Sequence, residues 1–228
     1  MTESNTTSQP TSTEEIPIPP NRWLGMLSKP LEILQYIFRY QPEFGVHRNL
    51  ILTGILFALG SRLPDWLAKG SHPIEVMIIL LVIGPFAGLL SGYIFAAVST
   101  TVGKWVSPVS DKKQMRTAIA WSGFPFAVAY GLFSLTYLIA YYLRPDPVQK
   151  FLIGNAPIGW LPVALGGIIF LYAIWVRWRS IGYTIQNSLG RAILCWAAAF
   201  IMTYGPLGIL AYAYFGLYTK SLDWIMAG

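Results

Sequence analysis

Apolar residues are gathered into five long runs along the chain, separated by short polar stretches. The runs extend from Asn49 to Leu67, from Glu75 to Val102, from Thr117 to Leu143, from Ile158 to Val176 and from Ala192 to Leu217. A helix needs roughly 20 residues to cross ~30 Å of hydrocarbon, so the second, third and fifth runs are comfortably long and the fourth is adequate. The first is marginal, because Arg62 and Asp65 lie near its end.

The runs have the character of helices rather than strands. Strands of a membrane barrel are ~10 residues long and alternate between polar and apolar positions. None of the five runs alternates, and the second contains an unbroken apolar stretch from Ile78 to Ile83. The pattern predicts an all-α integral membrane bundle of five transmembrane helices over residues 49–217, followed by a short C-terminal tail at 218–228.

A different pattern precedes the first run. Residues 22–48 are apolar but interrupted by charges and prolines, and Leu31, Leu34, Ile37 and Phe38 recur at helical spacing. Such a stretch is too broken to span a bilayer, so it predicts an amphipathic helix lying in the membrane interface. Residues 1–21 are rich in Ser, Thr and Pro and lack an apolar segment, so we expect a disordered polar tail.

Composition narrows the class of protein. Of the residues, 54% are apolar and 11% are charged, whereas a soluble domain is usually about a quarter charged. An ordinary soluble enzyme, a disulfide scaffold and a largely disordered chain are therefore excluded. The basic residues behind the net charge of +6 lie between the apolar runs, which indicates an orientation signal and no nucleic-acid partner.

The basic residues fall unequally on the two sides of a five-span bundle. One side receives 11 and the other 5; without a first span the division would be 9 against 7. Positive charge favours the cytoplasm, so we expect five spans, a cytoplasmic N-terminus and an external or lumenal C-terminus. Basic residues of the cytoplasmic loops are expected to contact lipid head groups. They are Lys112, Lys113, Arg116, Arg177, Arg179 and Arg191.

Small residues recur every fourth position in two of the runs. The second run carries Gly84, Gly88, Gly92 and Ala96, and the third carries Gly123, Ala127 and Gly131. Residues at this spacing share one helix face and allow two backbones to approach closely, which is a main source of attraction between helices in lipid. They predict either a packing surface inside the bundle or a docking face for a partner.

Prolines interrupt four of the runs. They are Pro85, Pro125, Pro162 and Pro206. Each removes a backbone hydrogen bond and tends to kink its helix. The prolines predict either hinges, as in the broken helices that frame transporter cavities, or a static helix shape.

Residues that carry chemistry are sparse. Cys195 is the only cysteine, and the two histidines, His47 and His72, fall on opposite sides of the predicted membrane. No Asp, Glu, Lys or Arg lies in the middle of a predicted span, whereas proton- or ion-coupled transporters usually need such groups at depth. We expect no catalytic residue, no metal site and no cofactor, and therefore no enzymatic activity.

The order of these features resembles the Yip family of membrane proteins. The similar elements are the lead-in of Trp23, Pro30 and Pro42, the Gly84–Pro85 pair with its following small residues, and the stretch AIAWSGFPFAV that contains Pro125. Trp175 then leads into the polar turn RSIGYTIQNSLGRA. The resemblance covers residues 23–217 and implies a polar cytoplasmic N-terminus followed by five closely spaced spans.

One departure from the family bears on the partner. Eukaryotic members that bind Rab-type GTPases carry an Asp-Leu-x-Gly-Pro signature, but here Val82 and Ile83 precede the Gly-Pro pair. The departure argues against GTPase binding. It makes the chain more similar to a prokaryotic member, which implies a bacterial cell membrane and no settled biochemical activity.

These observations leave three functional hypotheses. The first is a non-enzymatic, Yip-like scaffold or interaction protein that binds other membrane proteins or shapes the bilayer. The second is an accessory subunit of a larger membrane complex, with the small-residue faces as docking surfaces. The third is a permease for a small neutral or lipid-like substrate. Membrane lipids are partners in all three.

Overall fold

The structure, a computed structural model, describes residues 21–41, 43–69, 72–143 and 157–226. Within these residues all regular structure is helical, as predicted. The helices are α1 (Arg22–Ser28), α2 (Pro30–Tyr40), α3 (Val46–Ala68), α4 (Pro73–Val106), α5 (Lys112–Leu143), α7 (Pro157–Thr184) and α8 (Leu189–Met226). The tail predicted for residues 1–21 lies, up to residue 20, outside the described part of the chain.

Four helices are long and apolar enough to cross a membrane, which indicates a multi-pass integral membrane protein. They comprise Val46–Leu67 in α3, Pro73–Val106 in α4, Lys112–Ile139 in α5 and Val163–Thr184 in α7. The marginal first run is thus among them. The fifth run falls in α8, where many side chains beyond residue 206 lie outside the described set, so a fifth span stays a prediction. α8 also continues past Leu217, so residues 218–226 are helical and do not form the predicted tail.

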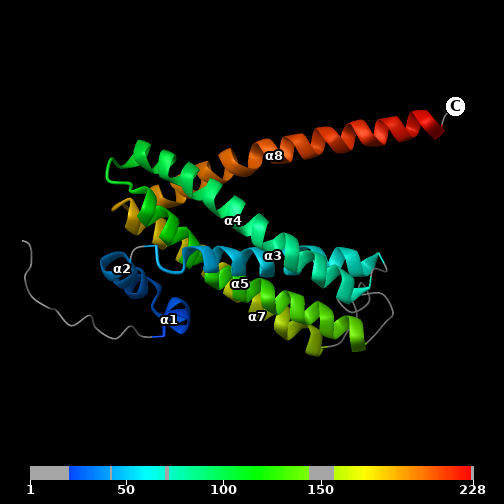
Figure 1. Cartoon of the computed structure of the whole chain (residues 1–228), viewed down its shortest axis with the longest axis horizontal. Helices are drawn as coiled ribbons and strands as arrows, with labels where there is room; N and C mark the ends of the chain where they lie inside the picture. The colour runs from blue at the N-terminus through cyan, green and yellow to red at the C-terminus, as the bar shows by residue number, and fades with distance from the viewer. Residues whose placement is uncertain (1–20, 42, 70–71, 144–156, 227–228) are drawn as a thin grey trace, which may run out of the picture.

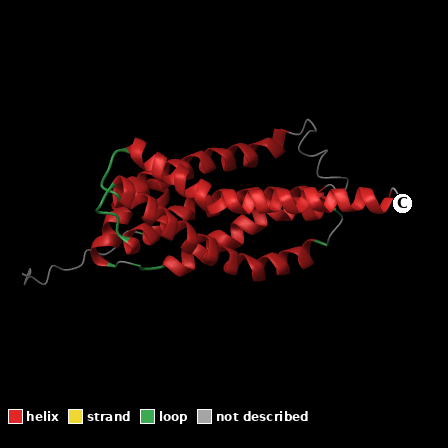
Figure 2. Cartoon of the chain, turned by 90° about the horizontal axis from the view of Figure 1, so that it is seen from above, coloured by secondary structure: helices red, strands yellow, loops and turns green. Residues whose placement is uncertain are grey.

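Helices α3, α4 and α7 all contact α5 (Figure 1). α3 contacts α4 on one side and α5 on the other, and α5 contacts α7 in turn. α8 packs against α4 and α7 near its own start and then diverges from the bundle. The end of α4, the start of α5 and the turn between α7 and α8 meet at one end, where the described loops gather (Figure 2).

This end of the bundle carries most of the exposed basic side chains, and we call it the basic end. Its exposed cations are Lys104, Lys112, Lys113, Arg179 and Arg191. Direct contacts hold the end together: the Thr184 hydroxyl lies 3.5 Å from the sulfur of Met115, across α7 and α5.

The N-terminal helix pair, α1 and α2, caps the basic end. Asn21 starts α1 by accepting a hydrogen bond from the Trp23 amide at 3.2 Å, and Pro30 opens α2, where its missing N–H costs nothing. The apolar face of α2 does not point toward lipid. Leu34 and Ile37 are fully buried in a cluster that includes Trp121 of α5, so the predicted amphipathic face is covered by the bundle itself.

Trp121 joins the helix pair to the bundle. Its side chain is fully buried, and its Nε1 donates a hydrogen bond of 2.8 Å to the Phe44 carbonyl. The Trp23 ring lies 5.6 Å from it. Burial of an aromatic ring of this size contributes several kcal/mol, so the helix pair is held by packing more than by polar contacts.

α4 shows how one long apolar helix divides its surface between lipid and protein. Ile78, Val82, Phe86 and Leu90 recur every fourth position and are between 57% and 71% exposed. Gly84 and its partners lie two residues away along the helix, on the opposite face at ~100° per residue. The bulky face is the surface that lipid would cover, and the small face turns into the bundle.

Prolines are accommodated within the helices. Pro85, Pro125 and Pro206 lie inside α4, α5 and α8, and Pro64 lies inside α3. Pro162 falls in α7, but its side chain is not among those described. Membrane helices tolerate proline when neighbouring helices satisfy the freed backbone groups, and each of these helices is continuous through its proline.

Candidate functional site

The small residues of α4 lie against the backbone of α3. A Cβ placed on Gly88 would stand 2.7 Å from the Cα of Gly54, and one on Gly84 would stand 2.7 Å from the Cα of Ile55. A Cβ on Gly92 would collide with the Leu50 side chain. Real Cβ atoms essentially never approach a backbone this closely, so positions 84 and 88 require glycine, whereas at position 92 only the flexible end of the Leu50 side chain would have to shift. These three residues, with Gly54, form what we call the α3–α4 contact.

The remaining small residues have different neighbours. Ala96 is buried against α5, α7 and α8 in a core cluster that includes Ile119 and Ile181. On α5, Ala127 is fully buried, and a Cβ on Gly131 would meet Leu56 of α3 at an ordinary 3.7 Å. The predicted faces therefore lie within the bundle and are occupied by helices of the same chain.

Gly123 is the exception among the small residues, because its neighbours are polar. A Cβ at Gly123 would stand 2.8 Å from the hydroxyl of Thr53 and 3.6 Å from a terminal nitrogen of Arg177. Because Gly123 has no side chain, the Thr53 hydroxyl of α3 and the Arg177 guanidinium of α7 can lie close to the α5 backbone at this position.

The structure does not place Arg177 in a loop, where the sequence predicted it. The hydropathy of the fourth run falls after Val176, which placed Arg177 in a loop at the lipid head groups. The structure instead continues α7 to Thr184 and includes Arg177 in the candidate span. Its guanidinium lies 5.3 Å from the ring centre of Phe126 on α5 and 6.0 Å from that of Phe95 on α4. The charge is directed into the bundle because Arg177 lies on the face of α7 that packs against the other helices.

α8 completes the surroundings of Arg177. The Tyr204 ring stacks on Phe95 with centres 6.2 Å apart, and its hydroxyl interacts with the Ser91 side chain and with the charge of Arg177. We call Arg177, Thr53, Ser91, Phe95, Phe126 and Tyr204, with the space at Gly123, the Arg177 cluster. It draws on α3, α4, α5, α7 and α8.

The Arg177 cluster leaves polar atoms unpaired. Nε of Arg177 and the hydroxyl of Thr53 are both enclosed without a hydrogen-bond partner. Among the described residues, the acidic side chains in ion pairs are Glu32, bound to Lys29, and Glu43, bound to Arg116, so none neutralises Arg177. An unpaired buried charge costs several kcal/mol, and arginine does not lose its proton in proteins. The arrangement is therefore suited to receive an anion.

The other predicted basic residues have separate roles at the basic end. Lys112 and Lys113 are exposed, the guanidinium of Arg179 lies 5.6 Å from the ring of Trp175, and Arg191 donates to the Asn187 side chain at 3.2 Å. These four remain on the surface, where a lipid head group can reach them.

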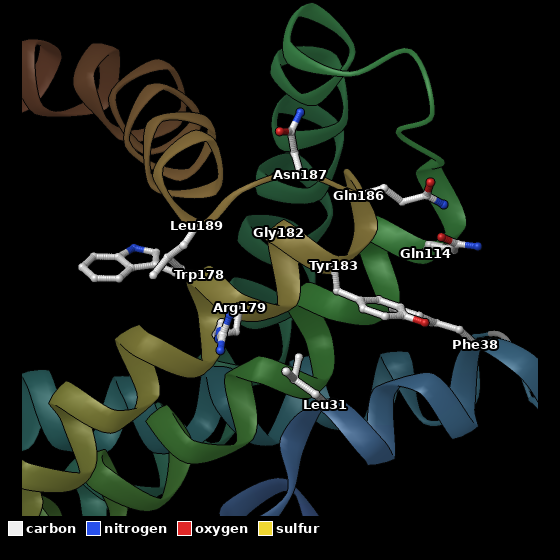
Figure 3. Close-up of a pocket in the computed structure, with 10 residues that line it drawn as sticks. All are labelled: Leu31, Phe38, Gln114, Trp178, Arg179, Gly182, Tyr183, Gln186, Asn187 and Leu189. Carbon is white, nitrogen blue, oxygen red and sulfur yellow. The ribbon is translucent and has the colours of Figure 1, made fainter.

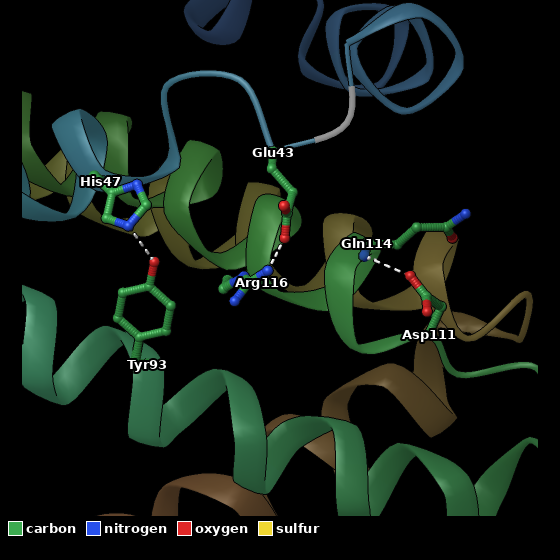
Figure 4. Close-up of polar contacts among 6 residues, drawn as sticks. All are labelled: Glu43, His47, Tyr93, Asp111, Gln114 and Arg116. Atoms are coloured by element: carbon green, nitrogen blue, oxygen red, sulfur yellow. Dashed lines mark hydrogen bonds and ion pairs between the residues drawn. The ribbon is translucent and has the colours of Figure 1, made fainter.

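Arg116 is withdrawn from that surface (Figure 4). It is half-buried and forms an ion pair with Glu43 in the turn before α3. Beside the pair, the Tyr93 hydroxyl lies 2.7 Å from Nε2 of His47. Glu43, Val46, His47, Tyr93 and Arg116 line a small pocket of about 190 Å³. The pair ties the turn to α5, so Arg116 has a structural partner in place of the predicted lipid.

A larger pocket, of about 520 Å³, opens at the basic end (Figure 3). Aromatic and amide side chains of α2, α5, α7 and the turn before α8 line it. They are Leu31, Phe38, Gln114, Trp178, Arg179, Gly182, Tyr183, Gln186, Asn187 and Leu189. Phe38 and Tyr183 stack with ring centres 5.6 Å apart, so α2 forms one wall. The pocket exists only because the helix pair docks here.

Nucleophiles and metal ligands are not grouped in the described part of the chain. No three of its His, Cys, Asp and Glu residues lie together as a metal site would need. Cys195 is buried and its sulfur lies 3.6 Å from the Ser99 carbonyl, and His72 is located at the start of α4, away from His47. Comparison with family models, with curated proteins and with solved structures gave no match.

Proposed function

We propose that the chain is a non-enzymatic, five-span membrane protein that acts as a Yip-like scaffold or interaction protein, with α8 as the fifth span. Its partners are membrane lipids and other membrane proteins, and no GTPase is included because the Asp-Leu signature is missing. The clustering of basic residues at one end supports a cytoplasmic N-terminus and an external C-terminus. The cell membrane of a bacterium is the location that agrees with the Yip resemblance.

One observation carries this proposal: the docked helix pair builds a protein surface on the basic end. α2 covers the bundle and forms a wall of the 520 Å³ pocket. A free interfacial helix would offer its apolar face to lipid, whereas this one presents its polar face and a lined pocket to the cytoplasm. A concave surface with a few polar groups among aromatic ones is typical of a binding site.

The proposal is tested at the pocket. Tyr183→Glu introduces a charge beside Phe38 without reaching the membrane core, and Lys113→Glu on the same end is the matched control outside the pocket. We expect the first change to reduce stoichiometric association with partner membrane proteins in native membranes, measured by cross-linking, and the second to leave it unchanged. Equal cross-linking by both variants and the unmodified chain would reject the pocket as the interaction surface.

The orientation is tested by labelling single cysteines from either side of the membrane. Cys195 is first replaced by Ala, and cysteines are introduced at Lys112, Lys69 and Lys220. Five spans place Lys112 on one side and the other two on the opposite side. Labelling of Lys220→Cys together with Lys112→Cys would show that α8 does not cross, and would leave a four-span bundle.

A second candidate function is a permease for a small or lipid-like substrate. The observation that favours it is the Arg177 cluster, a polar site between helices that a purely structural bundle does not require. Flux across liposomes that contain the purified protein tests it. The accessory-subunit hypothesis required the small residues of α4 to bind another protein. These glycines instead pack against α3 of the same chain, so they do not offer a docking face.

A further inference from the structure

We infer that the Arg177 cluster is a binding site for an oxyanion of the phosphate class, supplied either by a lipid head group or by free phosphate. This goes beyond a scaffold role, which needs no ligand inside the bundle. The inference rests on three features of the cluster: the direction of the guanidinium, the unpaired donors around it, and the access to it.

The guanidinium is directed away from the nearest membrane surface. Arg177 lies about two helical turns before the end of α7 at the basic end. Side chains lean toward the N-terminus of their helix, which for α7 is the opposite end, and the contact with Phe126 lies deeper in α5 than Trp121. Arg179, two residues further along α7, differs from Arg177 in its exposure: its guanidinium lies over the ring of Trp175 and remains on the surface.

The donors around Arg177 are those that a phosphate oxygen would use. Nε of Arg177 and the Thr53 hydroxyl are enclosed and without partners, and both side chains border the space at Gly123. Guanidinium and hydroxyl groups bind phosphate oxygens by charge-assisted hydrogen bonds. The rings of Phe95 and Phe126 face the cation but cannot replace a counter-charge, since cation–π contacts are weaker than the cost of an unpaired buried charge.

The guanidinium is accessible to a ligand. Arg177 is half-buried and retains part of its surface. Tyr204, which stacks on Phe95, belongs to α8, and α8 packs against α4 and α7 near its start before it diverges from the bundle (Figure 1). A head group could therefore enter between helices from the lipid, and a free ion could enter from the basic end.

The test compares two anion sources on the purified full-length protein in a neutral detergent. Sodium phosphate is compared with sodium chloride at equal ionic strength, and phosphatidylglycerol with phosphatidylcholine in mixed micelles. The thermal midpoint, followed by tryptophan fluorescence, reports binding. Arg177→Met removes the charge and keeps much of the volume, and Arg62→Met, the same substitution at an exposed position of α3 outside the cluster and the pockets, is the matched control.

We expect phosphate or phosphatidylglycerol to raise the midpoint of the natural protein and of Arg62→Met, and neither to raise that of Arg177→Met. A response to phosphate identifies a free oxyanion site, and a response to phosphatidylglycerol alone identifies a lipid head group. Without anion, Arg177→Met should be at least as stable as the natural protein, because an unpaired charge has been removed.

The inference is overturned if no anion stabilises the natural protein, if Arg177→Met responds equally, or if Arg62→Met loses the response as fully as Arg177→Met. Should Arg177→Met fail to fold, Arg177→Lys decides. It keeps the charge but loses the planar fork, so the dissociation constant should rise about tenfold or more. An unchanged dissociation constant in that variant contradicts the site.

Discussion

Two successive stretches of the inward face of α4 pack by opposite means. Toward α3, Gly84 and Gly88 bring backbone against backbone and leave no room for a single added carbon. One to two turns further along the helix, Ser91 and Phe95 border an arginine whose charge and Nε have no partner within the described structure. The first stretch is held by close contact and the second contains a costly polar group.

The difference separates stability from function within one helix. Close contact between small residues is a main source of helix association in lipid, where no hydrophobic force acts between helices. A buried charge without a partner works against association. The α3–α4 contact can therefore be explained by folding alone, whereas the Arg177 cluster requires another reason to exist.

The largest effect is expected where the backbones meet. Gly88→Leu should destabilise the protein by about 3 kcal/mol or more, because its side chain has no space and neither backbone can yield. Ala87→Leu, on the adjacent exposed position, is the control and should be near neutral. Thermal unfolding and the monodisperse yield in mild detergent measure both. A folded Gly88→Leu with unchanged stability would mean that α3 and α4 are not in close contact.

A smaller effect is expected at Gly123, where a side chain and not a backbone is the obstacle. Gly123→Ala should cost ~1–2 kcal/mol, since the new carbon would stand 2.8 Å from the Thr53 hydroxyl. Thr53→Ala should relieve part of this in the double variant, with a coupling of about 0.5–1 kcal/mol. Gly131→Ala, with 3.7 Å to its nearest neighbour, is the control. Strict additivity at Gly123 and Thr53 would contradict the contact.

Tyr204→Phe tests the polar stretch from α8. The ring that stacks on Phe95 is retained and the hydroxyl that interacts with Ser91 is lost, so we expect a loss of about 1 kcal/mol. Oxyanion binding should weaken in the same variant. Denaturation in the presence and absence of phosphate separates the two effects, and a loss of stability with unchanged binding would remove Tyr204 from the site.

Thr53→Val should change the stability of the protein least, and it should raise stability where the other substitutions lower it. It replaces an unpartnered buried hydroxyl with a methyl group of similar shape, so stability without anion should be unchanged or higher by up to about 1 kcal/mol. Thermal midpoints at matched detergent and lipid content measure it. A clear destabilisation would show that the Thr53 hydroxyl is already satisfied in the free protein.

The long helices could be read from sequence because length and hydropathy are local properties. Four of the five predicted runs coincide with helices fit to cross a membrane, and Gly84, Gly88 and Gly92 stand out through their spacing alone. Sequence did not decide whether those glycines faced a partner or another helix of the chain, because the partner of a face depends on the tertiary arrangement.

Two features were not predicted, because hydropathy does not say which neighbouring element a side chain will face. The apolar face of α2 would suit lipid or protein equally well, so its docking against Trp121 could not be foreseen. Arg177 follows a drop in hydropathy and was taken for a loop residue. The signal was its register: Arg177 follows Ala173 by four residues and precedes Ser180 by three and Thr184 by seven, and these three residues lie on the buried face of α7.

The weakly apolar character of α3 has a consequence for biogenesis. Its most apolar window has a mean hydropathy of 1.3, against 2.3 for α4, and it carries Asn49, which is buried with both amide atoms unpaired. A translocon that admits segments by hydropathy favours α4 strongly and α3 weakly. We therefore expect α3 to be secured in the bilayer only after α4 has been synthesised, so that the first of the long helices to emerge from the ribosome is anchored after the second.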